Sequence, residues 1–215
     1  GILKNKGFEF TDDEWEADII AINTCCFIGD AKQESINTIL EMAEHKKDAR
    51  CKVLVVAGCL AHRYQDEIIK EIPEVDAVLG TTSYGDIVKA LNEAEAGHVF
   101  QEFKDINALP EDSGRRVITT GGHYGYLKIA EGCDKHCTYC IIPSLRGKFR
   151  SVPEERLLKQ AEYMASQGVR ELILVAQETT IYGTDLYGKK TLHILLKKLC
   201  QIKGIRWIRV LYCYP

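Results

Sequence analysis

The stretch Cys133-Asp134-Lys135-His136-Cys137-Thr138-Tyr139-Cys140 places three cysteines within eight residues, with three and then two residues between them. It follows directly on the apolar run 126–130, which predicts a buried strand. Thiolates are soft ligands suited to iron–sulfur clusters or zinc, and barrel enzymes place their chemistry at the carboxyl ends of strands. Three cysteines can hold three irons of a 4Fe–4S cube, which leaves the fourth iron open to a substrate or cofactor.

Zinc is the alternative occupant of this loop, with His136 as a fourth ligand. No second cysteine pair follows at the spacing of a zinc finger, and the residues around His136 lack a helical pattern. The sequence therefore favours an iron–sulfur site.

Helices and strands alternate after the loop in the rhythm of a (βα) barrel. We predict helices over residues 153–167 and 189–203 and strands over 171–175 and 207–211. Ser151 is a plausible cap for the first helix, because its hydroxyl can accept a backbone N–H. Three units cannot close a barrel, so residues 123–215 predict a partial one.

The preceding part of the chain also alternates, which is typical of a parallel sheet covered by helices. We predict strands over residues 17–23, 53–57 and 76–80 and helices over 30–47, 63–71 and 84–96. Residues 98–122 are rich in turn formers and predict a linker. The fold class is therefore α/β, with a parallel-sheet domain over residues 1–97, a linker over 98–122 and a second domain over 123–215.

Composition is that of an ordinary globular protein, with 46% hydrophobic and 27% charged residues among 215. Residues 1–96 hold 19 acidic and 10 basic side chains, a charge of −9, whereas residues 123–215 hold 8 and 15, a charge of +7. The basic half either faces a polyanion or presents solvated helices. The apolar runs are too short for a membrane span and the first residues do not resemble a signal peptide, so we expect a cytoplasmic protein with no membrane partner. Nine cysteines then indicate metal binding or catalysis.

The Cys-x3-Cys-x2-Cys spacing, with an aromatic residue before the last cysteine, resembles the radical S-adenosylmethionine (SAM) superfamily. The resemblance implies that Cys133, Cys137 and Cys140 bind a 4Fe–4S cluster whose open iron is chelated by SAM. It also implies that an electron donor supplies the cluster, and that one electron from the cluster cleaves SAM to methionine and a 5′-deoxyadenosyl radical. Such a radical removes hydrogen from an unactivated carbon, which no side chain can do.

Residues 131–151 narrow the resemblance to the methylthiotransferase family. Asn23-Thr24-Cys25 and Gly58-Cys59-Leu60 match two of that family's three N-terminal cluster cysteines, which implies that Cys25 and Cys59 bind an auxiliary 4Fe–4S cluster that carries or donates sulfur. The family's first cluster cysteine would precede Gly1, and the rest of the barrel and an RNA-binding-like TRAM domain would follow residue 215. We therefore expect an internal fragment that is inactive by itself.

Of the cysteines outside the loop, Cys25 and Cys59 are the predicted ligands, and the other four are weaker candidates for a ligand role. Cys25 and Cys59 follow successive predicted strands, so we expect them at one edge of the sheet, with Cys26 turned away from it. Cys51, Cys200 and Cys213 match no motif, and we interpret them as structural.

Four residues outside the cysteines are candidate contacts of SAM or of a carboxylate. Tyr139 is a candidate to pack near adenine, and Gln177 lies at a strand end. Arg146, like Arg150, has the geometry to bind a carboxylate bidentately. Ordinary loop, core and surface positions are the alternatives for all of them.

Three further segments bear on the target of the reaction. Residues 23–31, 142–151 and 174–183 resemble the branch that modifies the β-carbon of an aspartate in small-subunit ribosomal protein S-twelve. The alternatives are the branch that modifies a tRNA adenosine and, from another class, a zinc-bearing RNA-binding module. Iron and sulfide content separates the enzyme from the module.

Overall fold

The structure, a computed structural model, describes residues 1–109 and 116–214, and the chain divides into two compact units. The first unit contains Gly1–Ser113 together with Tyr139–Leu145, and the second contains Gly114–Thr138 and Arg146–Pro215. Part of the predicted linker, residues 110–115, lies outside the described residues.

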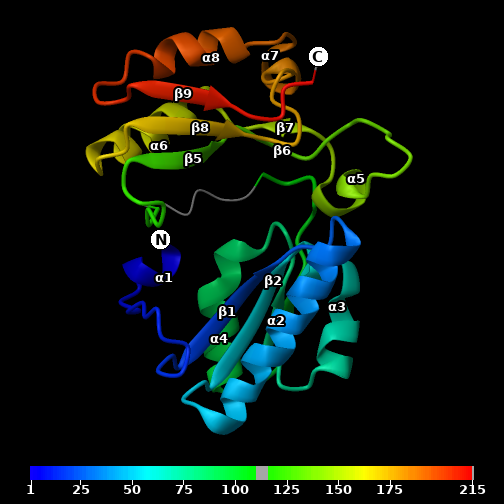
Figure 1. Ribbon diagram of the computed structural model, residues 1–215. Helices are drawn as coiled ribbons and strands as arrows, with labels where there is room; N and C mark the ends of the chain where they lie inside the picture. The colour runs from blue at the N-terminus through cyan, green and yellow to red at the C-terminus, as the bar shows by residue number, and fades with distance from the viewer. Residues whose placement is uncertain (110–115, 215) are drawn as a thin grey trace. The chain divides into compact units, whose positions relative to one another are not determined.

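A four-stranded parallel sheet forms the centre of the first unit (Figure 1), in the order β1-β2-β3-β4. The strands are β1 (Ile19–Thr24), β2 (Val53–Gly58), β3 (Ala77–Leu79) and β4 (Phe100–Glu102). The helical segments are α1 (Ile2–Asn5), α2 (Gly29–Asp48), α3 (Cys59–Glu71), the 3-10 turn η1 (Tyr84–Asp86) and α4 (Ile87–Glu95).

Helices cover both faces of this sheet, and β2 shows why its sequence is a continuous apolar run. Successive side chains of a strand point to opposite faces. Leu54 and Val56 join the core cluster that contains residues of α2 and α3. Val53 and Val55 join a second cluster that contains Ala90 and Leu91 of α4. Every residue of β2 is buried, as expected of a strand inside a parallel sheet.

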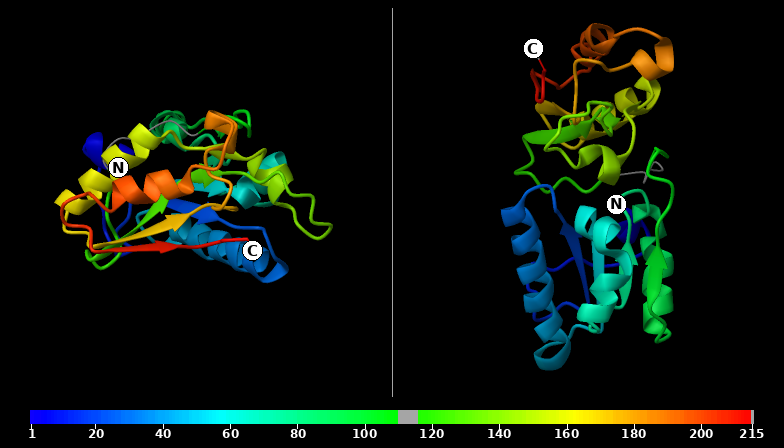
Figure 2. Two further views of the ribbon diagram at one scale, coloured as in Figure 1. Left: turned by 90° about the horizontal axis from the view of Figure 1, so that it is seen from above. Right: turned by 90° about the vertical axis from the view of Figure 1, so that its right-hand side faces the viewer.

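The second unit contains a three-stranded parallel sheet in the order β5-β8-β9 (Figure 2). The strands are β5 (Tyr124–Lys128), β8 (Glu171–Val175) and β9 (Trp207–Val210). A short antiparallel pair joins β6 (Ala130–Glu131) to β7 (Arg150–Ser151). The helices are α5 (Ile142–Arg146), which crosses the boundary between the units, α6 (Glu154–Ser166), α7 (Thr184–Tyr187) and α8 (Leu192–Leu199).

Within residues 116–214, the helices α6 and α8 pack against one face of this second sheet. Leu127, Leu172 and Leu174 share a core cluster with buried residues of α6 and α8. On the other face, the edge strands carry exposed side chains, with Tyr126 at 43% and Trp207 at 66% exposure, whereas Ile173 of the central strand β8 is buried. The sheet therefore has one face covered by helices and an open face with exposed aromatic rings on its edge strands.

The predicted strand over residues 126–130 is β5 at Tyr124–Lys128, the ends of most other elements shift by one or two residues, and the short elements α1, α5, α7, β6 and β7 are not predicted from the sequence. Four further differences are larger or concern the site. The predicted linker contains β4, which extends the first sheet by one parallel strand. The helix predicted to begin at residue 63 begins at Cys59 and is kinked at Gln65. Ser151 does not cap α6, because it lies in β7 and its hydroxyl accepts the backbone N–H of Gly183 at 2.8 Å.

The fourth difference is α8, which is shorter than the helix predicted over residues 189–203. The segment before it forms a turn in which Thr191 N–H donates to Tyr182 O at 2.7 Å. Among the described residues, no helix has the length and apolar character needed to cross a membrane.

Candidate functional site

The carboxyl ends of the three parallel strands of the second unit meet at one edge, where ligands of such sheets bind. The cysteine loop follows β5 and β6, Gln177 and Glu178 follow β8, and Tyr212 follows β9. Thr179 joins the last two segments, because its hydroxyl donates to Leu211 O at 2.9 Å. The segments that follow all three strands thus gather at this edge.

The beginning of the cysteine loop is held by a close approach of backbone. Gly132 has φ +80°, and a Cβ atom there would collide with the carbonyl oxygens of Gly147 and Lys148, so only glycine fits. Cys133 N–H donates to Gly147 O at 3.1 Å. Phe149 N–H donates to the Asp134 carboxylate at 2.9 Å. These contacts tie the start of the loop to the chain that follows it.

Gln177, a predicted SAM contact, has both ends of its amide engaged within the protein. Its Oε1 accepts the N–H of Gly132 at 2.8 Å, and its Nε2 donates to Glu131 Oε1 at 3.2 Å. Both partners directly precede Cys133. Gln177 therefore connects the end of β8 to the base of the cysteine loop.

Arg146 is not a surface arginine, because its side chain is only 19% exposed. Its Nη1 lies 3.6 Å from Oε2 of Glu131, a carboxylate that is almost fully buried and also pairs with Lys128. A buried carboxylate is costly unless cations and hydrogen bonds compensate it, and here two cations and the Gln177 amide do so. The Arg146 guanidinium thus takes part in an internal ion pair at the base of the cysteine loop.

A second buried carboxylate, Glu178, contacts the loop itself. Lys135 Nζ lies 2.9 Å from Glu178 Oε2, and the N–H and hydroxyl of Thr180 donate to Glu178 Oε1. Burial raises the pKa of Glu178, but the hydrogen bonds from Thr180 and Lys135 together outweigh it and hold the pKa below its usual value. Lys135 Nζ also lies over the Tyr214 ring.

Glu131, Lys135 and Glu178 belong to this site but are not among the residues predicted from the sequence. A signal was available for Glu178, since it follows Gln177 at the predicted end of a strand. A charged side chain at that point of an α/β sheet is a candidate for function or for support of a functional loop.

The three loop cysteines differ in exposure: Cys137 is exposed, whereas Cys133 and Cys140 are half-buried. Tyr139 is 86% exposed, and Tyr139–Leu145 group with the first unit. Among the described residues, no three His, Cys, Asp or Glu side chains are arranged to hold a metal ion. Cysteine thiols lose their protons when they bind a metal. Three cysteines outside disulfides, on a loop held by Gly132, fit the donor chemistry of a cluster.

The first unit brings its two predicted ligands to one edge, as expected. Thr24 and Gly58 are register partners in β1 and β2, so Cys25 and Cys59 both follow directly at the carboxyl edge. Gly58 has φ +105°, and a Cβ atom there would meet Thr24 O at 2.5 Å. Cys25 is exposed and its N–H donates to Ser35 Oγ at 2.9 Å, whereas Cys59 is buried.

The expected orientation of Cys26 is wrong. Cys26 is 2% exposed and belongs to the same core cluster as Cys59, because the short connection between β1 and α2 carries its side chain inward. Burial raises the pKa of the Cys26 thiol, and the nearby Cys59 raises it further. Cys51 is buried, as a structural cysteine would be, but Cys200 and Cys213 are exposed and are not explained by packing.

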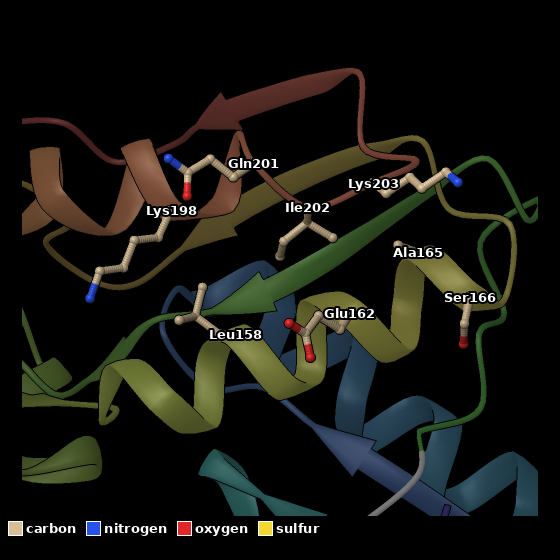
Figure 3. Close-up of a pocket in the computed structure, with 8 residues that line it drawn as sticks. All are labelled: Leu158, Glu162, Ala165, Ser166, Lys198, Gln201, Ile202 and Lys203. Carbon is tan, nitrogen blue, oxygen red and sulfur yellow. The ribbon is translucent and has the colours of Figure 1, made fainter.

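A groove on the helical side of the second unit is separate from these residues (Figure 3). It lies between α6 and α8 and has a volume of about 710 Å³. None of the predicted site residues lines it. The lining residues are Leu158, Glu162, Ala165, Ser166, Lys198, Gln201, Ile202 and Lys203.

Comparison with known families defines the class of protein. Residues 127–213 match the Radical SAM superfamily, and residues 1–80 match "Uncharacterized protein family UPF0004". A solved structure of the radical SAM methyltransferase TsrM from Kitasatospora setae, with cobalamin and a [4Fe-4S] cluster bound, aligns with a TM-score of 0.53 at 11% identity, over 89% of this chain and 44% of that one. The same enzyme with tryptophan and a SAM analogue aligns at 0.52 with 11% identity, over 88% of this chain and 42% of that one. The matches define a radical SAM protein, and the TsrM structures show likeness of fold alone.

Curated relatives narrow the class to one family. The chain is 62% identical to the ribosomal protein uS12 methylthiotransferase RimO of Lachnoclostridium phytofermentans, 53% identical to that of Clostridium botulinum and 51% identical to that of Clostridioides difficile. Each alignment covers 100% of this chain and 49%, 48% and 48% of the relative, so the chain spans about half their length. The chain belongs to the radical SAM methylthiotransferases.

Proposed function

We propose that the protein adds a methylthio group to the β-carbon of an aspartate in small-subunit ribosomal protein uS12. The observation that carries this proposal is 62% identity to a uS12 methylthiotransferase over all 215 residues, which include both units and both cysteine regions. The net change replaces one C–H bond of the aspartate by a C–S bond, with the methyl group supplied by a second SAM.

Two 4Fe–4S clusters and SAM are the cofactors in this proposal. Cys133, Cys137 and Cys140 hold the radical SAM cluster, and Cys25 and Cys59 contribute to an auxiliary cluster. When bound, these groups supply an electron, a carbon radical able to remove hydrogen, and sulfur. Support for the first set comes from the three-cysteine spacing and the radical SAM match over residues 127–213. Support for the second comes from the shared strand edge of Cys25 and Cys59.

The polypeptide's own work is to present thiolates and to orient them. Gly132 lets the backbone turn where any side chain would collide, and Gln177 holds the amide of Gly132 against the end of β8.

The partners follow from the same chemistry. The substrate is a small-subunit ribosomal protein, and an electron donor is needed to start each reductive cleavage of SAM. We place the reaction in the cytoplasm, where ribosomal proteins are made and assembled, with no membrane partner.

The test is a reaction of the intact protein after anaerobic reconstitution with iron and sulfide. The mixture contains uS12, SAM and a chemical reductant, and mass spectrometry follows both uS12 and a separate tRNA sample. We expect one methylthio group on a single aspartate of uS12 and none on tRNA, with no product from Cys137→Ala. Modification of a tRNA adenosine instead would overturn the proposed substrate.

A further inference from the structure

Gln177 and Glu178 are consecutive residues that follow β8, and each reaches a different part of the cysteine loop. We propose that they are positioning residues, a two-point clamp that holds the loop in its ligand-ready conformation on both sides of Cys133. The inference deepens the proposed function and rests on it, since the loop is taken to hold the radical SAM cluster.

The first point of the clamp acts just before Cys133. Gln177 Oε1 accepts the Gly132 N–H at 2.8 Å, and its Nε2 donates to the buried Glu131 carboxylate at 3.2 Å. A planar amide with both ends engaged has little freedom to rotate. The backbone at Gly132 is therefore held at a fixed distance from the end of β8.

The second point acts between Cys133 and Cys137. Glu178 is only 2% exposed and binds Lys135 Nζ at 2.9 Å through Oε2, while Thr180 occupies its Oε1. A charged hydrogen bond at a desolvated acceptor is stronger than an exposed pair and costs more to break. Lys135 lies two residues from each of those cysteines, so this ion pair restrains the stretch that joins them.

Restraint of the loop before it is loaded has a chemical consequence. A loop that must present three thiolates loses conformational entropy on binding, and support from neighbouring side chains lowers that cost. The clamp should therefore slow the loss of the bound cluster. A merely structural pair elsewhere in the sheet would not change that rate.

The experiment measures iron release to a chelator from the reconstituted intact protein. Lys135→Met and Glu178→Gln remove the same ion pair, so each should release iron about tenfold faster, and the double variant should match the single variants. Lys135→Arg should restore slow release because it keeps the pair. Glu171→Gln, which removes the ion pair with Arg209 at 2.8 Å in the same sheet, is the matched control and should release iron at the wild-type rate.

The first point is tested on the apo-protein by hydrogen exchange. Gln177→Leu should exchange the amides of residues 132–137 about fivefold faster, with the melting temperature of each variant recorded as a check of folding. Absence of a SAM-sensitive 4Fe–4S signal in the wild type would defeat the proposed function. Wild-type rates in the variants, or equally fast release from Glu171→Gln, would overturn the clamp.

Discussion

The two units place cysteines at strand ends in opposite kinds of surroundings. In the first unit, Cys59 and Cys26 lie in an apolar core beneath helices that cover both faces of the sheet. In the second, Cys137 is exposed on a loop whose supports are the buried carboxylates of Glu131 and Glu178. Packing holds the first region and polar contacts hold the second. A shared arrangement of strands thus presents thiols by two different physical means.

The largest expected effects separate the roles of the two regions. Cys137→Ala in the intact protein should abolish the SAM-dependent change in the EPR spectrum and reductive cleavage of SAM, because a radical SAM cluster needs all three loop ligands. Cys25→Ala should keep SAM cleavage and lose methylthio transfer to uS12. EPR spectroscopy, methionine release and the mass of uS12 measure these outcomes. Loss of SAM cleavage in Cys25→Ala would contradict the assignment of different roles to the cysteines of the two units.

Core packing should distinguish the two sheets by stability. Leu54 is 0% exposed inside the first unit, so Leu54→Ala should lower the free energy of unfolding by about 2–5 kcal/mol. Tyr126 lies on the open face of the second sheet at 43% exposure, and Tyr126→Ala should cost about 1 kcal/mol or less. Urea denaturation of both variants gives the difference. Equal losses would mean that the open face is covered in the protein.

Gly132 tests the backbone support of the cysteine loop. Gly132→Ala combines positive φ with a collision against the carbonyls of Gly147 and Lys148, and we expect a loss of about 1–3 kcal/mol together with reduced iron content. Gly188 also has positive φ, at +68°, but nothing lies within 4 Å of its added Cβ. Gly188→Ala is therefore the matched control for backbone strain alone. Normal iron content in Gly132→Ala would show that the loop does not need this approach.

The smallest effect concerns thiol reactivity in the apo-protein. Cys25 is exposed, whereas Cys26 is buried and its pKa is raised by burial, so the Cys26 thiol holds less thiolate near neutrality than an ordinary cysteine. We expect iodoacetamide to modify Cys26 more than about tenfold slower than Cys25, as measured by peptide mass spectrometry. Unfolding in urea should remove the difference. Fast labelling of Cys26 in the folded protein would contradict its place in the core.

Local sequence determined the elements and the ligand-bearing loop. The strand predicted over residues 171–175 is β8 residue for residue, since a short apolar run between turn formers needs no distant partner to be recognised. The three loop cysteines could also be recognised as ligands from the sequence, because three ligands within eight residues form a local pattern. The shared edge of Cys25 and Cys59 could also be predicted, because each cysteine follows one of two neighbouring parallel strands, β1 and β2.

Tertiary structure alone decided how those cysteines are surrounded. Sequence patterns placed Cys26 away from the edge, yet core packing under the helices buried it beside Cys59. Gln177 is a predicted ligand contact, and only the packed structure shows that it also supports Gly132, 45 residues earlier in the chain. The short strand β4 lies in a turn-rich segment that shows no strand pattern, and it is a strand because it pairs with β3. Periodicity reports which face of an element is apolar, but contacts between distant residues exist only after the chain has packed.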